Sequence, residues 1–219
     1  MSVEPALGLL EFDSIAVGIE AGDAMAKRAP IETISAGTVQ PGRYLVLVSG
    51  AVADVEEALD AGRAVADGSL VDSVFLPNAH PDVVAAVGGA RRQGGGEALG
   101  VIETPTVAAI IRAADAGVKA ANVRLLELRL ADGLGGKGYL LFGGPVAEVT
   151  AAVEAGTAEL APEGPAVHRV IAQLHGEMRN NLDAAARFSD RARPAPPRPV
   201  PDTARGRPAA RRPDRQGEG

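Results

Sequence analysis

The sequence predicts an α/β protein, of the α+β kind, that consists of two tandem copies of one β-α-β-β-α-β unit. Two observations lead to this fold class. A motif near the N-terminus returns 92 residues later, and both copies alternate short apolar runs with helical patterns in the same order. Each copy is expected to form an antiparallel or mixed sheet with helices on one face.

The repeat is visible in the residues themselves. Residues 6–11 read Ala-Leu-Gly-Leu-Leu-Glu, and residues 98–103 read Ala-Leu-Gly-Val-Ile-Glu. The correspondence continues in further pairs: Asp23 with Asp115, Lys27 with Lys119 and, after a two-residue insertion in the second copy, residues 50–55 with 144–149. The aspartate and lysine are four residues apart in both copies, so each pair can form an ion pair on its helix.

In the first copy, residues 7–12 are an apolar run typical of a strand. Asp13 or Ser14 can cap a helix that carries Ile15 and Ile19. Residues 31–38 turn through Gln-Pro-Gly into residues 44–48, which is a hairpin pattern. A second helix is expected at about residues 52–66, and residues 70–76 form the last strand.

The second copy repeats this order. Thr104 and Pro105 predict a helix start, because a hydroxyl can cap the helix and proline has no N–H to leave unpaired at the first helical position. Strands are expected at 123–130 and 139–142 around a glycine-rich loop, then a helix at 145–159 and a strand at 166–171.

The predicted organisation is a first domain at 1–90, a glycine-rich linker at 91–97, a second domain at 98–186 and a tail at 187–219. The tail has nine arginines against four acids and seven of the 16 prolines, so we expect it to be disordered. Its basic excess could attract acidic partners, although a solvated tail is the favoured interpretation.

Composition excludes several function classes. The chain has no cysteine, which excludes disulfides, thiolate zinc sites, cysteine nucleophiles and iron–sulfur clusters held by its own thiolates. No stretch reaches the about 18 apolar residues of a membrane span, and an acidic N-terminus does not resemble a secretory signal. We therefore expect a cytoplasmic protein without membrane or nucleic-acid partners.

Residues 133–138 match G-x-G-x-x-G, but a strand pattern follows where dinucleotide binding needs a helix. His80 and His175 occupy equivalent places in the two copies, which favours a structural or interfacial role. Glu11 and Glu103 could suggest acid–base chemistry, yet a role at a strand end or helix start fits better. With no nucleophile elbow or metal-ligand spacing, no enzyme, catalytic residue or metal site is predicted.

Three motifs resemble bacterial microcompartment shell domains: Ala-Leu-Gly-x-x-Glu-Thr, Ala-Ala-Asp-Ala-x-x-Lys-Ala-Ala-Asn-Val and Gly-Gly-Lys-Gly. Two such domains in unpermuted order are similar to tandem-domain shell proteins. Residues 70–80 are most like those of propanediol-utilisation compartments, and the resemblance covers about residues 1 to 180. It implies a homotrimer that forms a pseudohexagonal tile and has a structural role in the shell. Because the chain has no cysteine, we expect no cofactor.

The resemblance also implies site residues. The hairpin loops would surround a central pore, with these residues lining or flanking it: Val39, Gln40, Pro41, Gly42, Asp132, Gly133 and Leu134. Four residues would lie at the tile edge: Lys27, Lys119, Asn78 and His80. The implied partners are other shell proteins, both hexameric tiles and pentameric vertices, and enclosed enzymes.

Two positions depart from the family pattern. Propanediol-type relatives have a cysteine before Pro-Gly in the first loop, where three thiolates hold an iron–sulfur cluster, and this chain has Gln40. We therefore expect an open pore for small polar metabolites. Gln173 stands where many relatives have arginine, which affects the edge of the second copy.

Two alternative functions remain at this stage. A trimeric sensor of related topology would bind small molecules between subunits, but it would need basic residues in a long mobile loop, and neither hairpin is long enough. A redox carrier would need a bound cluster despite the missing cysteines.

Overall fold

The computed structural model describes residues 5–160 and 166–184. The first repeat comprises β1 (Ala6–Phe12), α1 (Ile15–Arg28), β2 (Thr33–Val39), β3 (Arg43–Gly50), α2 (Val52–Ala64), β4 (Leu70–Leu76) and α3 (Pro81–Val87). The second comprises β5 (Ala98–Thr104), α4 (Val107–Ala120), β6 (Arg124–Leu130), β7 (Gly138–Gly144), α5 (Val146–Ala158), β8 (Val167–Ala172) and α6 (Gly176–Ala184). The segment 187–219, predicted to be a disordered tail, lies outside the described residues.

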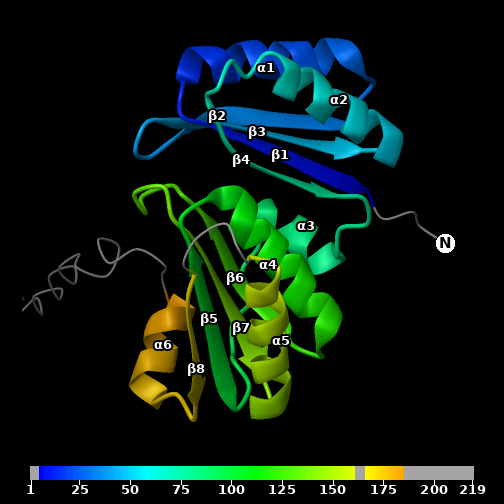
Figure 1. Ribbon diagram of the computed structural model, residues 1–219. Helices are drawn as coiled ribbons and strands as arrows, with labels where there is room; N and C mark the ends of the chain where they lie inside the picture. The colour runs from blue at the N-terminus through cyan, green and yellow to red at the C-terminus, as the bar shows by residue number, and fades with distance from the viewer. Residues whose placement is uncertain (1–4, 161–165, 185–219) are drawn as a thin grey trace, which may run out of the picture. The chain divides into compact units, whose positions relative to one another are not determined.

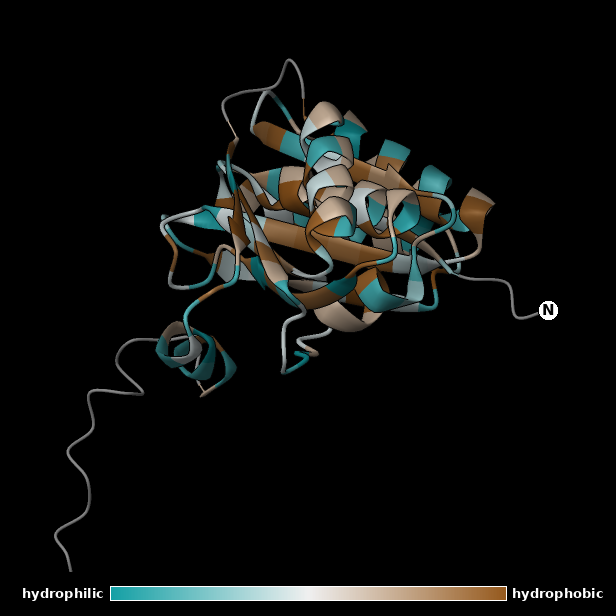
Figure 2. Ribbon diagram, turned by 90° about the horizontal axis from the view of Figure 1, so that it is seen from below, coloured by the Kyte–Doolittle hydropathy of each residue, from teal (hydrophilic) through white to brown (hydrophobic). Residues whose placement is uncertain are grey.

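The predicted β-α-β-β-α-β order is confirmed in both repeats, and each repeat adds one short helix, α3 or α6, that the sequence did not predict. Each sheet has four antiparallel strands, in the orders β2-β3-β1-β4 and β6-β7-β5-β8. The helices α1 and α2 cover one face of the first sheet, and α4 and α5 cover one face of the second (Figure 1). The strands are hydrophobic over much of their length (Figure 2).

Strand register aligns the two repeats independently of the sequence match. Glu11 on β1 pairs with Asp72 on β4, and Glu103 on β5 pairs with Val167 on β8. Position 72 of the first repeat therefore corresponds to position 167 of the second.

The first helix of each repeat begins with a hydroxyl cap. Ser14 caps α1 by accepting a hydrogen bond of 3.4 Å from the Val17 amide, as predicted. The predicted start of the second helix at Thr104 and Pro105 is wrong. Thr104 completes β5, and Thr106 caps α4 by accepting from the Ala109 amide at 3.3 Å. Thr106 stands 92 residues after Ser14, so the repeat locates the cap better than the proline does.

The cores of the two repeats contain the same contacts with large and small residues exchanged. In the first repeat the large residue is on the strand: a Cβ on Gly18 would lie 2.6 Å from the Tyr44 side chain. The equivalent residues of the second repeat are Ile110 and Gly138, and there the side chain of Ile110, on the helix, fills the space beside Gly138. Such compensation keeps the packed volume of the layer between helix and sheet nearly constant.

Candidate pore and assembly site

The first predicted pore loop is the tight turn between β2 and β3. Val39 ends β2, and its carbonyl oxygen accepts a hydrogen bond of 3.0 Å from the Gly42 amide. Gly42 has a φ of +104°, which glycine adopts readily. Gln40 and Pro41 form the exposed tip.

The second predicted pore loop, residues 131–137, joins β6 to β7. Its ends are tied by a hydrogen bond of 3.1 Å from the Ala131 amide to the Lys137 carbonyl oxygen, and Asp132, Gly133 and Leu134 lie between them. This loop reaches the first one, because a Cβ on Gly136 would lie 3.0 Å from the Cδ atom of Pro41. The structure thus brings the hairpin tips of both repeats together, as a shared pore requires.

A basic residue at the base of each loop pairs with the glutamate at the end of the central strand. Arg43 donates to Glu11 at 2.5 Å, and the Lys137 ammonium lies 3.5 Å from the Glu103 carboxylate. Because both cations have a carboxylate partner, their charge at the loops is largely compensated.

Glu11 joins the two repeats. Its side chain is fully buried, and its Oε2 atom accepts a hydrogen bond of 2.8 Å from the backbone amide of Val107, the first residue of α4. Burial raises the pKa of the Glu11 carboxyl above its usual range, although Arg43 and the Val107 amide offset part of that effect. The predicted helix-start role is confirmed, but the helix belongs to the other repeat.

Asp72 makes the second set of contacts between the repeats. Its carboxylate accepts a hydrogen bond of 2.5 Å from the Thr106 hydroxyl and forms an ion pair of 3.4 Å with Arg112. Arg112 also donates to the Ser73 carbonyl oxygen at 2.8 Å.

Three of the four predicted tile-edge residues take part in the same contact. The His80 amide donates to Asp115 at 2.8 Å, and the Lys119 ammonium donates to the Asn78 carbonyl oxygen at 2.5 Å. The fourth residue, Lys27, forms the predicted ion pair with Asp23 at 2.5 Å on an exposed face. That these four residues lie at the edge of a tile stays a prediction.

We call this contact the in-chain seam. It is formed by Glu11, Asp72, Ser73, Asn78 and His80 of the first repeat and by Thr106, Val107, Arg112, Asp115 and Lys119 of the second. The repeat does not point to Asp72, Thr106 and Arg112 as a group of interacting residues. Their counterparts in the other repeat are Val167, Ser14 and Glu20, which cannot form the same contacts.

The two histidines at equivalent positions have the same structural role. The Nδ1 atom of His80 accepts from the Asp82 amide at 3.2 Å, and that of His175 accepts from the Glu177 amide at 3.3 Å. Each ring thus satisfies a backbone amide in the first turn of a short helix. The two rings therefore make equivalent structural contacts in the two repeats.

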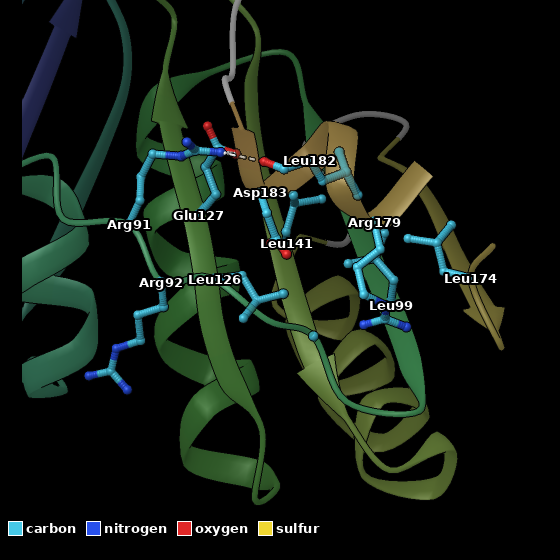
Figure 3. Close-up of a pocket in the computed structure, with 11 residues that line it drawn as sticks. Arg91, Arg92, Leu99, Leu126, Glu127, Leu141, Leu174, Arg179, Leu182 and Asp183 are labelled. Carbon is cyan, nitrogen blue, oxygen red and sulfur yellow. Dashed lines mark hydrogen bonds and ion pairs between the residues drawn. The ribbon is translucent and has the colours of Figure 1, made fainter. Parts of the chain in front are cut away.

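A small cavity lies beneath α6, on the face of the second sheet opposite α4 and α5 (Figure 3). Arg91 donates to the Glu127 carboxylate and to the Leu182 carbonyl oxygen, both at 2.9 Å, while the Oε1 atom of Glu127 makes no hydrogen bond to the described residues. The cavity volume of about 20 Å³ suits one water molecule.

The described part of the chain adds two observations. None of its helices is long and apolar enough to cross a membrane. Among residues 5–160 and 166–184, no group of three or more His, Cys, Asp and Glu side chains is arranged to hold a metal ion. The first hairpin loop does not fit an iron–sulfur cluster held by thiolates, since Gln40 supplies no thiolate and the chain has no cysteine.

Comparison with known proteins identifies the repeat. Residues 6–79 and 98–174 each match the model of the BMC domain. The chain is 41% identical over 174 residues to the bacterial microcompartment shell protein PduT of Citrobacter freundii, a match that covers 79% of this chain and 95% of that protein. It is 29% identical over 210 residues to the carboxysome assembly protein CcmO of Synechocystis, with 88% and 69% covered.

A solved structure shows the same fold. A microcompartment protein from Desulfitobacterium hafniense superposes with a TM-score of 0.71 at 40% identity, covering 81% of this chain and 99% of that one. The comparisons give no support to a small-molecule sensor. The chain therefore belongs to the family of bacterial microcompartment shell proteins that carry the BMC domain, and it contains this domain twice.

Proposed function

We propose that this chain is a structural shell protein without enzymatic activity that forms a homotrimer, in which six domains make one pseudohexagonal tile around a polar pore. The two domains correspond to residues 1–90 and 98–186. Neighbouring tiles and pentameric vertices complete the shell, and the enclosed enzymes lie behind it.

One observation supports the trimer. The surfaces that the chain leaves exposed are equivalent, in the other repeat, to surfaces that the chain buries. Val107 and Ile111 on α4 are fully buried, and they belong to a core cluster that also contains residues of β1 and β4 in the first repeat. Their counterparts on α1, Ile15 and Ile19, are 41% and 54% exposed. The apolar pair that is buried on α4 of the second repeat is thus exposed on α1 of the first repeat.

The complementary face is also uncovered. In the first repeat β4 contacts α4, and α3 buries Val83 and Ala86. In the second repeat every residue of the equivalent strand β8 is exposed, and α6 buries none of its residues. A second copy could therefore place its α1 on β8 as α4 lies on β4.

Such a contact is heterologous, because the two faces differ, and heterologous contacts form closed rings when the rotation between subunits permits. Three chains with two domains each would then close a six-domain ring.

The pore would lie where the hairpin tips meet. Gln40, Pro41 and the loop that carries Asp132 and Leu134 contact each other through Pro41 and Gly136. Because Arg43 and Lys137 are paired with carboxylates, the passage would present mainly the Gln40 amide, backbone groups and the Asp132 carboxylate. That chemistry suits small polar metabolites.

The assembly mass of the full chain tests the proposal. Light scattering should give three chains per particle, and electron microscopy should show tiles or sheets. Ile19→Asp should yield folded monomers, because the side chain is already half exposed, whereas Val52→Asp on α2, 40% exposed in the wild type, should leave the trimer intact. A wild-type chain that stays monomeric at every concentration would refute the trimer.

A further inference from the structure

The second repeat carries the counterparts of Glu11 and His80 from the in-chain seam, and among the described residues no segment of the chain docks on them as α4 docks on the first repeat. We propose that a second protomer docks there in the same register. In that register the carboxylate of Glu103 accepts the backbone N–H of Ile15 of the next protomer. The inference rests on the proposed trimer and assigns the residues that hold its subunits together.

The register follows from Glu11 and Glu103, which end equivalent strands. Each pairs with the loop cation of its own repeat, Arg43 or Lys137. Glu11 is buried and engages the first amide of α4, whereas Glu103 is 41% exposed. The equivalent of the Val107 amide is the Ile15 amide at the start of α1. A carboxylate at this position also suits the positive end of a helix.

The same register supplies a second cross-chain contact. In the in-chain seam the His80 amide donates to Asp115. The counterparts are the His175 amide and Asp23, whose side chain is 60% exposed. Both histidines bind the next turn through Nδ1 in the same way, so the backbone at position 175 has the geometry of the backbone at position 80.

A third contact joins Lys27 to the carbonyl oxygen of Gln173, as Lys119 joins that of Asn78. This contact uses a backbone carbonyl, so the change from asparagine to glutamine leaves it intact. The backbone differs at this position, because φ is 55° at Gln173 and is not positive at Asn78.

Three contacts of the in-chain seam have no counterpart: those of Asp72 with Thr106 and Arg112, and that of Arg112 with the Ser73 carbonyl oxygen. Val167 stands where the first repeat has Asp72, and Glu20 stands where α4 has Arg112. The contact between chains therefore keeps three polar contacts and the apolar pair Ile15 and Ile19, but lacks the Asp72 ion pair. We expect the trimer to dissociate at denaturant concentrations that leave each chain folded.

The test compares Glu103→Ala with three variants of the full chain. Glu103→Ala should raise the concentration at which half the trimer dissociates by at least about tenfold. The substitution removes one charge-assisted hydrogen bond from each contact between neighbouring protomers, so the losses in binding free energy add up around the ring. Glu103→Gln, which keeps an acceptor, should recover part of the loss. Lys137→Ala removes the partner of Glu103 within the chain and should have a much smaller effect, and Glu154→Ala, exposed on α5, should have none.

Hydrogen exchange locates the effect. The segment from Ser14 to Val17 should be protected in the trimer and should lose protection in Glu103→Ala at a concentration where most of that variant is still trimeric. A trimer that forms equally well with Glu103→Ala, or an equal weakening by Lys137→Ala, would overturn the register and leave the trimer standing. A wild-type monomer would instead refute the proposed function itself.

Discussion

The Oε2 atom of Glu11 lies 2.8 Å from the backbone nitrogen of Val107, so a carboxylate of the first repeat holds the first amide of a helix in the second. The two residues are 96 positions apart in the sequence. The carboxylate is fully buried and also holds Arg43. The two repeats of the chain are therefore joined by a buried carboxylate. In place of water, this carboxylate contacts the Arg43 guanidinium and the N-terminus of α4.

Glu11→Gln should reveal this burial as a pH dependence. Burial raises the pKa of the Glu11 carboxyl in the folded chain, so the folded state binds the proton more tightly than the unfolded state does. The free energy of unfolding of the wild type, relative to Glu11→Gln, should then increase as pH falls from 7 through the raised pKa toward its usual value near 4.5.

Urea unfolding of both proteins at several pH values measures this difference, in which the other titrating groups cancel. A relative loss of wild-type stability on acidification would mean that the ion pair with Arg43 outweighs burial, contrary to our expectation.

Thr106→Ala should cost more stability than Ser14→Ala. Both changes remove a helix cap, which contributes about 1 kcal/mol. Thr106 also donates to the buried end of Asp72, so its loss should cost roughly a further 1 to 2 kcal/mol. Unfolding at one fixed protein concentration gives both values. Equal costs would show that the Thr106 contact with Asp72 contributes nothing to the in-chain seam.

The sequence was sufficient to predict the elements because its signals are local and occur twice. Ser14 and the first hairpin follow from capping and turn preferences, and the second copy confirms the order. The helices α3 and α6 were missed for a physical reason: each is short, and the apolar residues of α3 are buried by contacts with the other repeat. Local patterns do not contain that information.

The same limit applies to the site. A repeat comparison identified Glu11, Lys119 and His80 as paired features and predicted the ion pair of Lys119 with Asp115, which the structure has at 2.5 Å. It assigned no contact between the two repeats. The structure shows that they lie together at one seam, since α4 packs on the strands of the first repeat. Asp72 could not have been found this way, because its counterpart is Val167 and the signal is absent from the second copy.

Gly136→Ala should disturb the contact between the hairpin loops. Gly135 and Gly136 both have positive φ, so alanine at either position should cost about 1 kcal/mol of backbone strain. At Gly136 the new Cβ would also press on Pro41 at 3.0 Å, whereas at Gly135 nothing lies within 4 Å.

The free energy of unfolding of the two variants separates strain from contact. A larger loss for Gly136→Ala supports a direct contact of the loops, with Gly135→Ala as the matched control. Identical losses would show that the loops do not support each other.

The exchanged packing of the two cores predicts a strong coupling between Gly117 and Phe142. The ring of Phe142 fills the space beside Gly117, and the equivalent residues of the first repeat are Met25 and Val48. Gly117→Met alone should overpack the core by about 1 to 3 kcal/mol. Phe142→Val alone should leave a cavity that costs roughly 2 to 3 kcal/mol.

The double variant reproduces the first repeat's packing, so it should be more stable than either single variant. A double-mutant cycle on the free energy of unfolding should give a coupling of about 2 to 3 kcal/mol in its favour. Combined instead with Val55→Ala, in the core of the other repeat, Gly117→Met should show additive effects. Additivity of Gly117→Met with Phe142→Val would mean that the two repeats do not use equivalent cores, and the correspondence on which the protomer register depends would fail with it.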